Sequence, residues 1–72
     1  MSIRYKIDIL AALKQAGYST YRLREDKLLG EATIQLLRKD KPVSWGNIST
    51  ICRLMDCQPG DIMEYVEDKD NV

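Results

Sequence analysis

The chain has 72 residues with 11 basic and 11 acidic side chains, two cysteines and no histidine, so its formal net charge is zero. This length supports one domain, residues 1–72, with a core in residues 3–67. The core is small, because a domain of this size buries only about 60% of the surface that its unfolded chain exposes. Without histidine, Cys52 and Cys57 cannot assemble a zinc site or a haem attachment, and no apolar run approaches the roughly 20 residues that span a bilayer.

These exclusions narrow the functional classes. The chain has no histidine and no glycine-rich phosphate loop, so nothing is expected to hold a substrate, a metal or a cofactor, and an enzyme is not expected. The N-terminus lacks the long apolar region of a secretory signal. The two cysteines are predicted to be buried free thiols rather than a disulfide, which places the chain in a reducing cytoplasm.

The charges are distributed unevenly along the chain. Residues 1–42 hold nine basic and five acidic groups, a net +4, whereas residues 43–72 hold two basic and six acidic groups, a net −4. Such a molecule can turn a positive face towards phosphates and keep its acidic end away from them. The alternative is an uneven charge distribution without function, as occurs on many small domains.

The N-terminal third predicts an extended segment and a first helix. Residues 2–6 alternate apolar and polar side chains, which is typical of a short half-buried strand or an arm. Apolar spacing then indicates a helix that uses Ile7, Leu10, Ala11 and Lys14, with Ile9 and Leu13 widening the apolar side. Gly17 is expected to end this helix.

Two short helices joined by a tight turn are predicted next. The second helix begins with Ser19 as its cap and runs to Asp26 or Lys27, and the third runs from Gly30 or Glu31 to Arg38. Leu23 and Leu29 are expected to face inward, as are Ile34 and Leu37, which lie three apart in the third helix. The outer side of the third helix is left polar.

The C-terminal part predicts a loop, two helices and a strand. Residues 38–42 form a charged loop, and Ser44 caps a fourth helix over residues 45–56 with an inner stripe at Ile48, Ile51, Cys52 and Met55, helped by Leu54. Trp45 is expected to pack against the protein rather than make a surface contact. A fifth helix spans residues 59–64 and buries Ile62 and either Met63 or Tyr65. Residues 65–67 can then pair with residues 3–5 as short terminal strands, and the acidic tail 68–72 is expected to fray.

Four segments in this order resemble the Cro and lambda-repressor-type (XRE-like) helix-turn-helix regulators: STYRL (19–23), GEATIQ (30–35), LRKDK (37–41) and ICRLMDCQPGDIMEYV (51–66). The likeness is strongest to small stand-alone bacterial and phage-associated members and covers residues 3–67. It implies an all-α, five-helix, lambda-repressor-like DNA-binding domain with the helix-turn-helix at the second and third helices.

The resemblance places candidate DNA contacts at the start of the second helix, on the recognition helix at residues 31–38, and in the loop that follows. Thr20 falls where such proteins touch the DNA backbone, and its neighbours add two further candidates. The full set is Thr20, Tyr21, Arg22, Glu31, Ala32, Thr33, Gln35, Leu36, Lys39 and Lys41. The chain also departs from the family pattern, with Leu28 at a position where a turn glycine is common, Arg24 where a small alanine is usual and Glu31 where a basic or polar residue is frequent.

Several of these residues have two interpretations. Gln35 can pair with adenine, while Glu31 either accepts a hydrogen bond from cytosine N4 or repels phosphate. Thr33 either contacts DNA or bonds back to its own helix. Leu36 either touches a thymine methyl group or belongs to a protein interface.

Together these features predict a transcriptional regulator, a repressor, that binds double-stranded DNA as a homodimer with the third helix in the major groove. No small-molecule substrate and no membrane partner are expected. The alternative is a protein-interaction module of the same fold that modulates another regulator without binding DNA, which the zero net charge, Glu31 and Leu36 favour.

Overall fold

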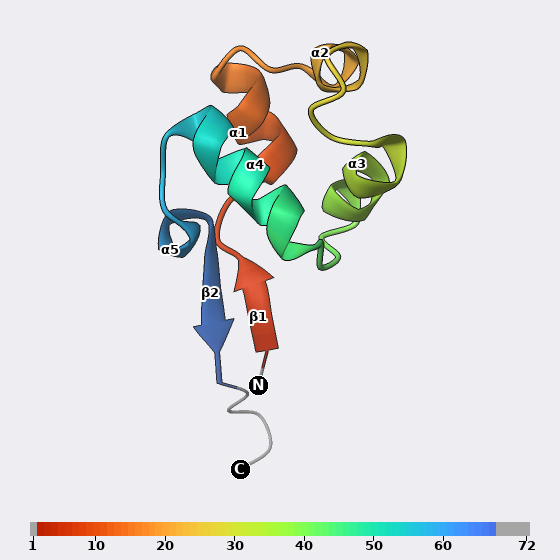
Figure 1. Ribbon diagram of the computed structural model, residues 1–72. Coiled ribbons are helices and arrows are strands. Elements are labelled where there is room, and N and C mark those ends of the chain that lie inside the picture. The colour runs from red at the N-terminus through yellow and green to blue at the C-terminus, as the bar shows by residue number, and fades with distance from the viewer. Residues whose placement is uncertain (1, 68–72) are drawn as a thin grey trace.

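Five short helices and a two-stranded sheet make up the computed structural model, which describes residues 2–67 (Figure 1). The elements follow in the order β1 (Ser2–Tyr5), α1 (Ile9–Gln15), α2 (Thr20–Glu25), α3 (Glu31–Arg38), α4 (Trp45–Met55), α5 (Pro59–Ile62) and β2 (Met63–Val66). The predicted five helices are confirmed, and the terminal strands pair as predicted, although the second strand is Met63–Val66 rather than residues 65–67. The expected fraying of residues 68–72 lies outside the described residues. Within residues 2–67, no helix has the length and apolar character needed to cross a membrane.

Side chains at the helix starts satisfy backbone N–H groups that lack a partner inside the helix. Asp8 caps α1, Ser19 caps α2 and Ser44 caps α4, each accepting a hydrogen bond of 3.2 Å from a backbone N–H in the first turn. At α5 the capping side chain comes from the first turn of the helix instead, since the Gln58 backbone N–H donates to the Asp61 carboxylate at 2.9 Å. Four of the five helix starts are therefore fixed by local sequence.

The first four helices end in the same way, with one residue in the left-handed conformation. These residues are Gly17, Lys27, Asp40 and Asp56, with φ between 52° and 100°. After α2, the Leu28 N–H donates to the Leu23 carbonyl at 2.9 Å and the Lys27 N–H to the Arg24 carbonyl at 3.1 Å, which is the Schellman pattern. In the turn between α2 and α3, the residue with positive φ is therefore Lys27, one residue before Leu28, where the family pattern commonly has glycine.

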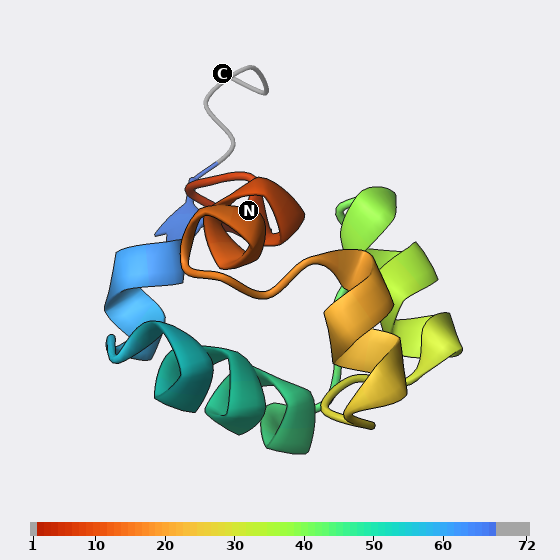
Figure 2. The same ribbon diagram turned by 90° about the horizontal axis from the view of Figure 1, so that it is seen from above.

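A single buried cluster joins the helices. Its members are fully or almost fully buried: Ile9, Leu13, Leu23, Leu29, Ile34, Leu37, Ile51 and Ile62. The helix α1 contacts both α3 and α4, so the core lies between these three helices with α2 closing one side (Figures 1 and 2). The predicted inward positions of α2 and α3 are confirmed, and α3 rests on the protein through Ile34 and Leu37.

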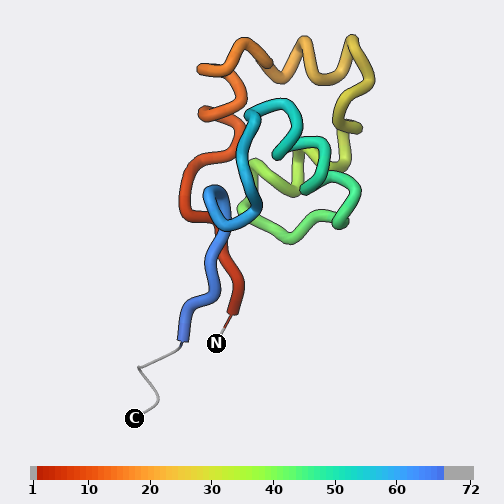
Figure 3. The backbone as a smooth tube through the Cα atoms, turned by 60° about the vertical axis from the view of Figure 1, so that its left-hand side comes forward, coloured from red at the N-terminus to blue at the C-terminus, as the bar shows by residue number. Residues whose placement is uncertain are grey.

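The two terminal strands pair antiparallel and extend away from the helices (Figure 3). Ile3 lies opposite Tyr65 and Tyr5 opposite Met63, which puts these four side chains on one face of the sheet. The Tyr5 hydroxyl donates to the Lys41 carbonyl at 2.7 Å and so connects β1 to the loop that follows α3.

The structure corrects the predicted details of α1 and α5. Ile7 lies outside α1 and is 38% exposed, because the cap residue Asp8 has an extended backbone and the helix starts after it. The inner face of α1 is formed by Ile9 and Leu13. Helix α5 ends at Ile62 rather than at residue 64, because Met63 is extended and pairs with Tyr5.

The packing predicted for Trp45 is wrong, since its side chain is 77% exposed. The first turn of α4, where Trp45 lies, extends beyond the buried side chains of this helix, which are Ile48 and Ile51. The cysteines are free but only half-buried. Burial, followed by the neighbouring Cys52, raises the pKa of the Cys57 thiol.

Candidate nucleic-acid interface

One side of α3 is exposed to solvent. Successive residues of a helix are about 100° apart, so burial of Ile34 and Leu37 turns the opposite side outward. We call this the outer face of α3, and its exposed residues are Glu31, Ala32, Gln35, Leu36 and Lys39. Leu36 is its only large apolar side chain and is 37% exposed. Five of the predicted contact residues are thus brought together on one surface.

Three side chains are linked across the α2–α3 turn at the start of the outer face of α3. One Glu31 oxygen lies 2.7 Å from Arg24 Nε, and the Gln35 amide nitrogen donates to the other Glu31 oxygen at 2.9 Å. The carboxylate is also favoured at this position by the N-terminal end of the helix dipole. Glu31 therefore faces solvent as a paired group rather than as an isolated negative charge.

Thr33 lies at the edge of α3 that faces α4. It is half-buried, and its hydroxyl accepts a 2.9 Å hydrogen bond from Asn47 Nδ2. Neither of the two predicted interpretations included this contact. The hydrogen bond links the first turn of α3 to the first turn of α4 and helps to hold α3 in place.

The candidates on α2 lie apart from the outer face of α3. Thr20 is half-buried and lines a depression of about 480 Å³ between α1, the start of α2 and the end of α3, together with Lys14 and Arg38. Tyr21 is 69% exposed. Arg22 bonds to the Asp26 carboxylate at 3.3 Å and to the Gly17 carbonyl at 3.0 Å, and it lies over the Tyr18 ring.

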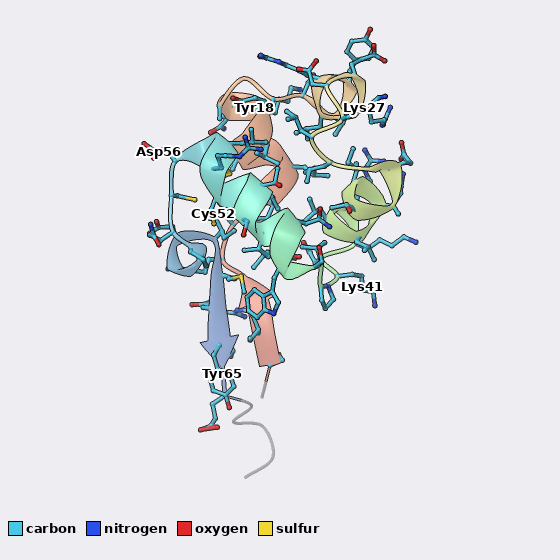
Figure 4. The ribbon with its side chains drawn as sticks, viewed as in Figure 1. Tyr18, Lys27, Lys41, Cys52, Asp56 and Tyr65 are labelled. Atoms are coloured by element: carbon cyan, nitrogen blue, oxygen red, sulfur yellow. The ribbon has the colours of Figure 1, made fainter. Side chains whose placement is uncertain are left out.

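The two lysines after α3 extend the polar surface. Lys39 ends the helix, and the Lys41 N–H donates to the Leu36 carbonyl at 2.8 Å. Both side chains are exposed, and neither forms an ion pair within residues 2–67. Lys27 and Lys41 lie on the α2–α3 side of the molecule, whereas Tyr65 lies at the far end of the sheet (Figure 4).

Sequence reasoning missed two residues that shape this surface. Arg24 and Glu31 are seven residues apart and belong to different helices, so no helical spacing indicates their contact. Asn47 and Thr33 are fourteen residues apart and meet only because α4 folds against α3. The signal for Arg24 was present only as a departure from the family pattern, and Glu31, its partner, is another such departure.

The titratable groups of the described residues include Tyr5, which contacts the loop after α3. Within residues 2–67, no three His, Cys, Asp or Glu side chains come together in a metal-binding group. Burial, followed by the negative charge of Asp40, raises the pKa of Tyr5, whose hydroxyl is already donated to the Lys41 carbonyl. The surface offers an exposed amide, paired and unpaired charges, and small side chains, which suit hydrogen bonding to a polar partner.

Comparison with known proteins yields two matches. The model of a family described as the Cro/C1-type HTH DNA-binding domain matches residues 6–68. A protein of Bacillus subtilis (strain 168), named uncharacterized HTH-type transcriptional regulator YozG, is 30% identical over 70 residues, which is 97% of this chain and 83% of that protein. No solved structure matches significantly.

Proposed function

The chain belongs to the Cro/C1-type HTH DNA-binding domain family, and from this premise we propose that it is a sequence-specific DNA-binding transcriptional regulator that acts as a repressor. In this proposal α2 and α3 form the helix-turn-helix, α3 enters the major groove, and no catalytic step is involved. Repression follows from occupying operator DNA in the cytoplasm. The observation that carries the proposal is the uncovered outer face of α3 with lysines at its C-terminal end.

The shape and chemistry of α3 support major-groove binding. A major groove admits one helix and presents donors and acceptors at the base edges. Ala32 is small enough to allow a close approach, and Gln35 supplies both a donor and an acceptor. The contact between Thr33 and Asn47 and the buried Ile34 keep α3 fixed, so little conformational entropy is lost when DNA binds.

The unpaired cations support binding to phosphates. Lys39 and Lys41 leave α3 at its C-terminal end, where a helix in the groove passes close to the DNA backbone. Arg38 precedes them, and Lys27 lies in the α2–α3 turn. The zero net charge does not oppose this binding, because local charge rather than the total sets the potential that phosphates meet.

A homodimer is part of the proposal, because one small module contacts few phosphates and binds weakly. The surface that we assign to the dimer consists of Ile3, Trp45 and Tyr65, which are 62%, 77% and 58% exposed. Ile3 and Trp45 line a groove of about 550 Å³, and Tyr65 lies opposite Ile3 on the same face of the sheet. The two aromatic side chains expose roughly 300 Å² per protomer. Two copies thus supply more than half of the roughly 1,000 Å² of a specific interface, before Ile3 is counted.

Salt-dependent binding to duplex DNA tests the function. An operator selected from a random duplex pool should bind with an affinity that falls steeply as salt rises. Lys39→Glu and Lys41→Glu should each weaken binding about tenfold, and Lys39→Gln should reduce the salt slope by about 1 per protomer. The matched control is Arg53→Glu, because Arg53 is also an exposed cation but lies on α4 rather than on the outer face of α3. Equal loss in the control and in the lysine variants would refute the assigned surface.

The second candidate is a protein-interaction module of the same fold. The exposed Leu36 and the carboxylate of Glu31, both on the outer face of α3, favour it. The two candidates give opposite results in the same experiment. Undetectable binding to any duplex at low salt, from a protein that is folded, would reject DNA binding and support the interaction module.

A further inference from the structure

Glu31 forms a bridge between a cation and an amide on the outer face of α3. Its two carboxylate oxygens have different partners, Arg24 Nε at 2.7 Å and Gln35 Nε2 at 2.9 Å. The bridge spans two helices, since Arg24 is in the last turn of α2, whereas Glu31 and Gln35 occupy successive turns of α3. The side chain best suited to read a base is therefore held by its neighbours before any DNA arrives.

The chemistry of the carboxylate determines which end of the amide faces it. An ionised carboxylate only accepts hydrogen bonds, so the NH2 end of Gln35 must turn towards Glu31. The carbonyl oxygen Oε1 then points away from Glu31, with one N–H of the amide still free. This orientation does not depend on how amide nitrogen and oxygen were assigned, because the reverse orientation would place two acceptors against each other.

We propose that Arg24 and Glu31 are positioning residues that orient the Gln35 amide so that it selects adenine over guanine in the major groove; this inference rests on the proposed function. Adenine presents a donor at N6 and an acceptor at N7, which match an outward carbonyl oxygen and a free N–H. Guanine presents acceptors at both O6 and N7, so an outward carbonyl oxygen faces an acceptor. Glu31 therefore acts on the sequence preference without touching a base.

The ion pair with Arg24 allows the Glu31 carboxylate to lie close to DNA. An unpaired carboxylate at the start of α3 would be repelled by phosphates, whereas the ion pair carries no net charge. The Arg24 and Glu31 side chains are 44% and 55% exposed, so the pair is partly screened by water and its role is orientation rather than stability. Arg24 and Glu31, two of the departures from the family pattern, thus act together.

Four variants test the inference by base preference in a duplex pool. Gln35→Ala identifies the base pair that Gln35 reads, because discrimination is lost there. Glu31→Ala removes the partner of the amide, and Glu25→Ala is the matched control, since it removes the same charge from an exposed residue of α2 that forms no ion pair within residues 2–67. The double variant R24E/E31K keeps the ion pair and the net charge but presents a donor to Gln35, which turns the amide round.

The expected preferences differ in size and sign. The wild-type protein and Glu25→Ala should favour adenine over guanine at the identified position by about tenfold. Glu31→Ala should reduce this ratio to about threefold or less, and R24E/E31K should favour guanine. Either an unchanged adenine preference in Glu31→Ala or a guanine preference in the wild type would overturn the inference while leaving DNA binding intact.

A measurement without DNA separates the two proposals. The side-chain amide resonances of Gln35 in the free protein, identified by their loss in Gln35→Ala, should shift in Glu31→Ala and stay in place in Glu25→Ala. Failure of all variants to bind duplex DNA would reject the proposed function. Unchanged Gln35 amide resonances in Glu31→Ala would reject the orienting role of Glu31, whatever the outcome of the binding experiment.

Discussion

Replacing Lys27 by glycine should stabilise the protein, because Lys27 is the residue with positive φ between α2 and α3. Its φ is 55°, and its own N–H donates to the Arg24 carbonyl at 3.1 Å. The Lys27 side chain is exposed and forms no hydrogen bond or ion pair within residues 2–67. The substitution therefore removes little except the backbone strain of a side chain in the left-handed region.

The size of the effect follows from two opposing terms. A non-glycine residue in the left-handed conformation costs roughly 1–2 kcal/mol. Glycine recovers this cost but gives the unfolded chain more freedom, which offsets roughly 0.5–1 kcal/mol. The net gain should be about 0.5–1 kcal/mol in the free energy of unfolding, or roughly 2–8 °C in Tm for a domain of this size.

Thermal and urea unfolding followed by circular dichroism measures this gain. Two further variants calibrate the result. Asp40→Gly at the end of α3 should gain less, because aspartate tolerates the left-handed region better than lysine does. Gly17→Ala should lose stability, because φ at Gly17 is 100°. A Lys27→Gly protein that is no more stable than the wild type, alongside a destabilised Gly17→Ala, would refute the claim that strain at Lys27 limits the stability of this turn.

Three further predictions concern the support of α3. Asn47→Ala should lower the free energy of unfolding by about 1 kcal/mol and speed amide exchange at the start of α3, because it removes the half-buried bond to Thr33. Ile34→Ala should cost about 3 kcal/mol in urea unfolding, since Ile34 is fully buried beneath the outer face of α3. Because the pKa of Tyr5 is raised in the folded state, its contribution to stability is complete below about pH 10 and is lost as pH rises further. The stability difference between the wild type and Tyr5→Phe should therefore be constant up to about pH 10 and shrink above it, and a difference that grows there would contradict this assignment.

Local sequence signals predicted the elements where a single residue decides the outcome. Ser19 and Ser44 start helices because their hydroxyls reach backbone N–H groups three residues ahead. Ile34 and Leu37 face inward because their spacing puts them on one side of a helix. Both kinds of signal depend on neighbours in the chain, so they can be recognised without knowledge of the fold.

Other predictions failed where tertiary packing decides. Trp45 has a large aromatic side chain of the kind found in protein cores, but its position in the first turn of α4 places it beyond the buried cluster. The predicted end of the fifth helix was wrong because pairing with β1, more than fifty residues earlier in the chain, pulls Met63 into an extended conformation.

The candidate interface divides in the same manner. The exposure of Gln35 and Lys39 follows from helical spacing in α3 and was predictable. The bridge from Arg24 to Glu31 depends on how the turn at Lys27 brings two helices together. Sequence alone marked these two residues as unusual and gave no indication that they meet.

The antiparallel pairing of Ser2 with Val66 means that the chain enters and leaves the described domain at neighbouring points, about one strand spacing apart. A unit with adjoining entry and exit can be inserted into a surface turn of another protein without pulling that turn open. The helices of the inserted domain can then still move and bind a partner as one rigid body. Fusions made through either strand would therefore leave α3 unobstructed.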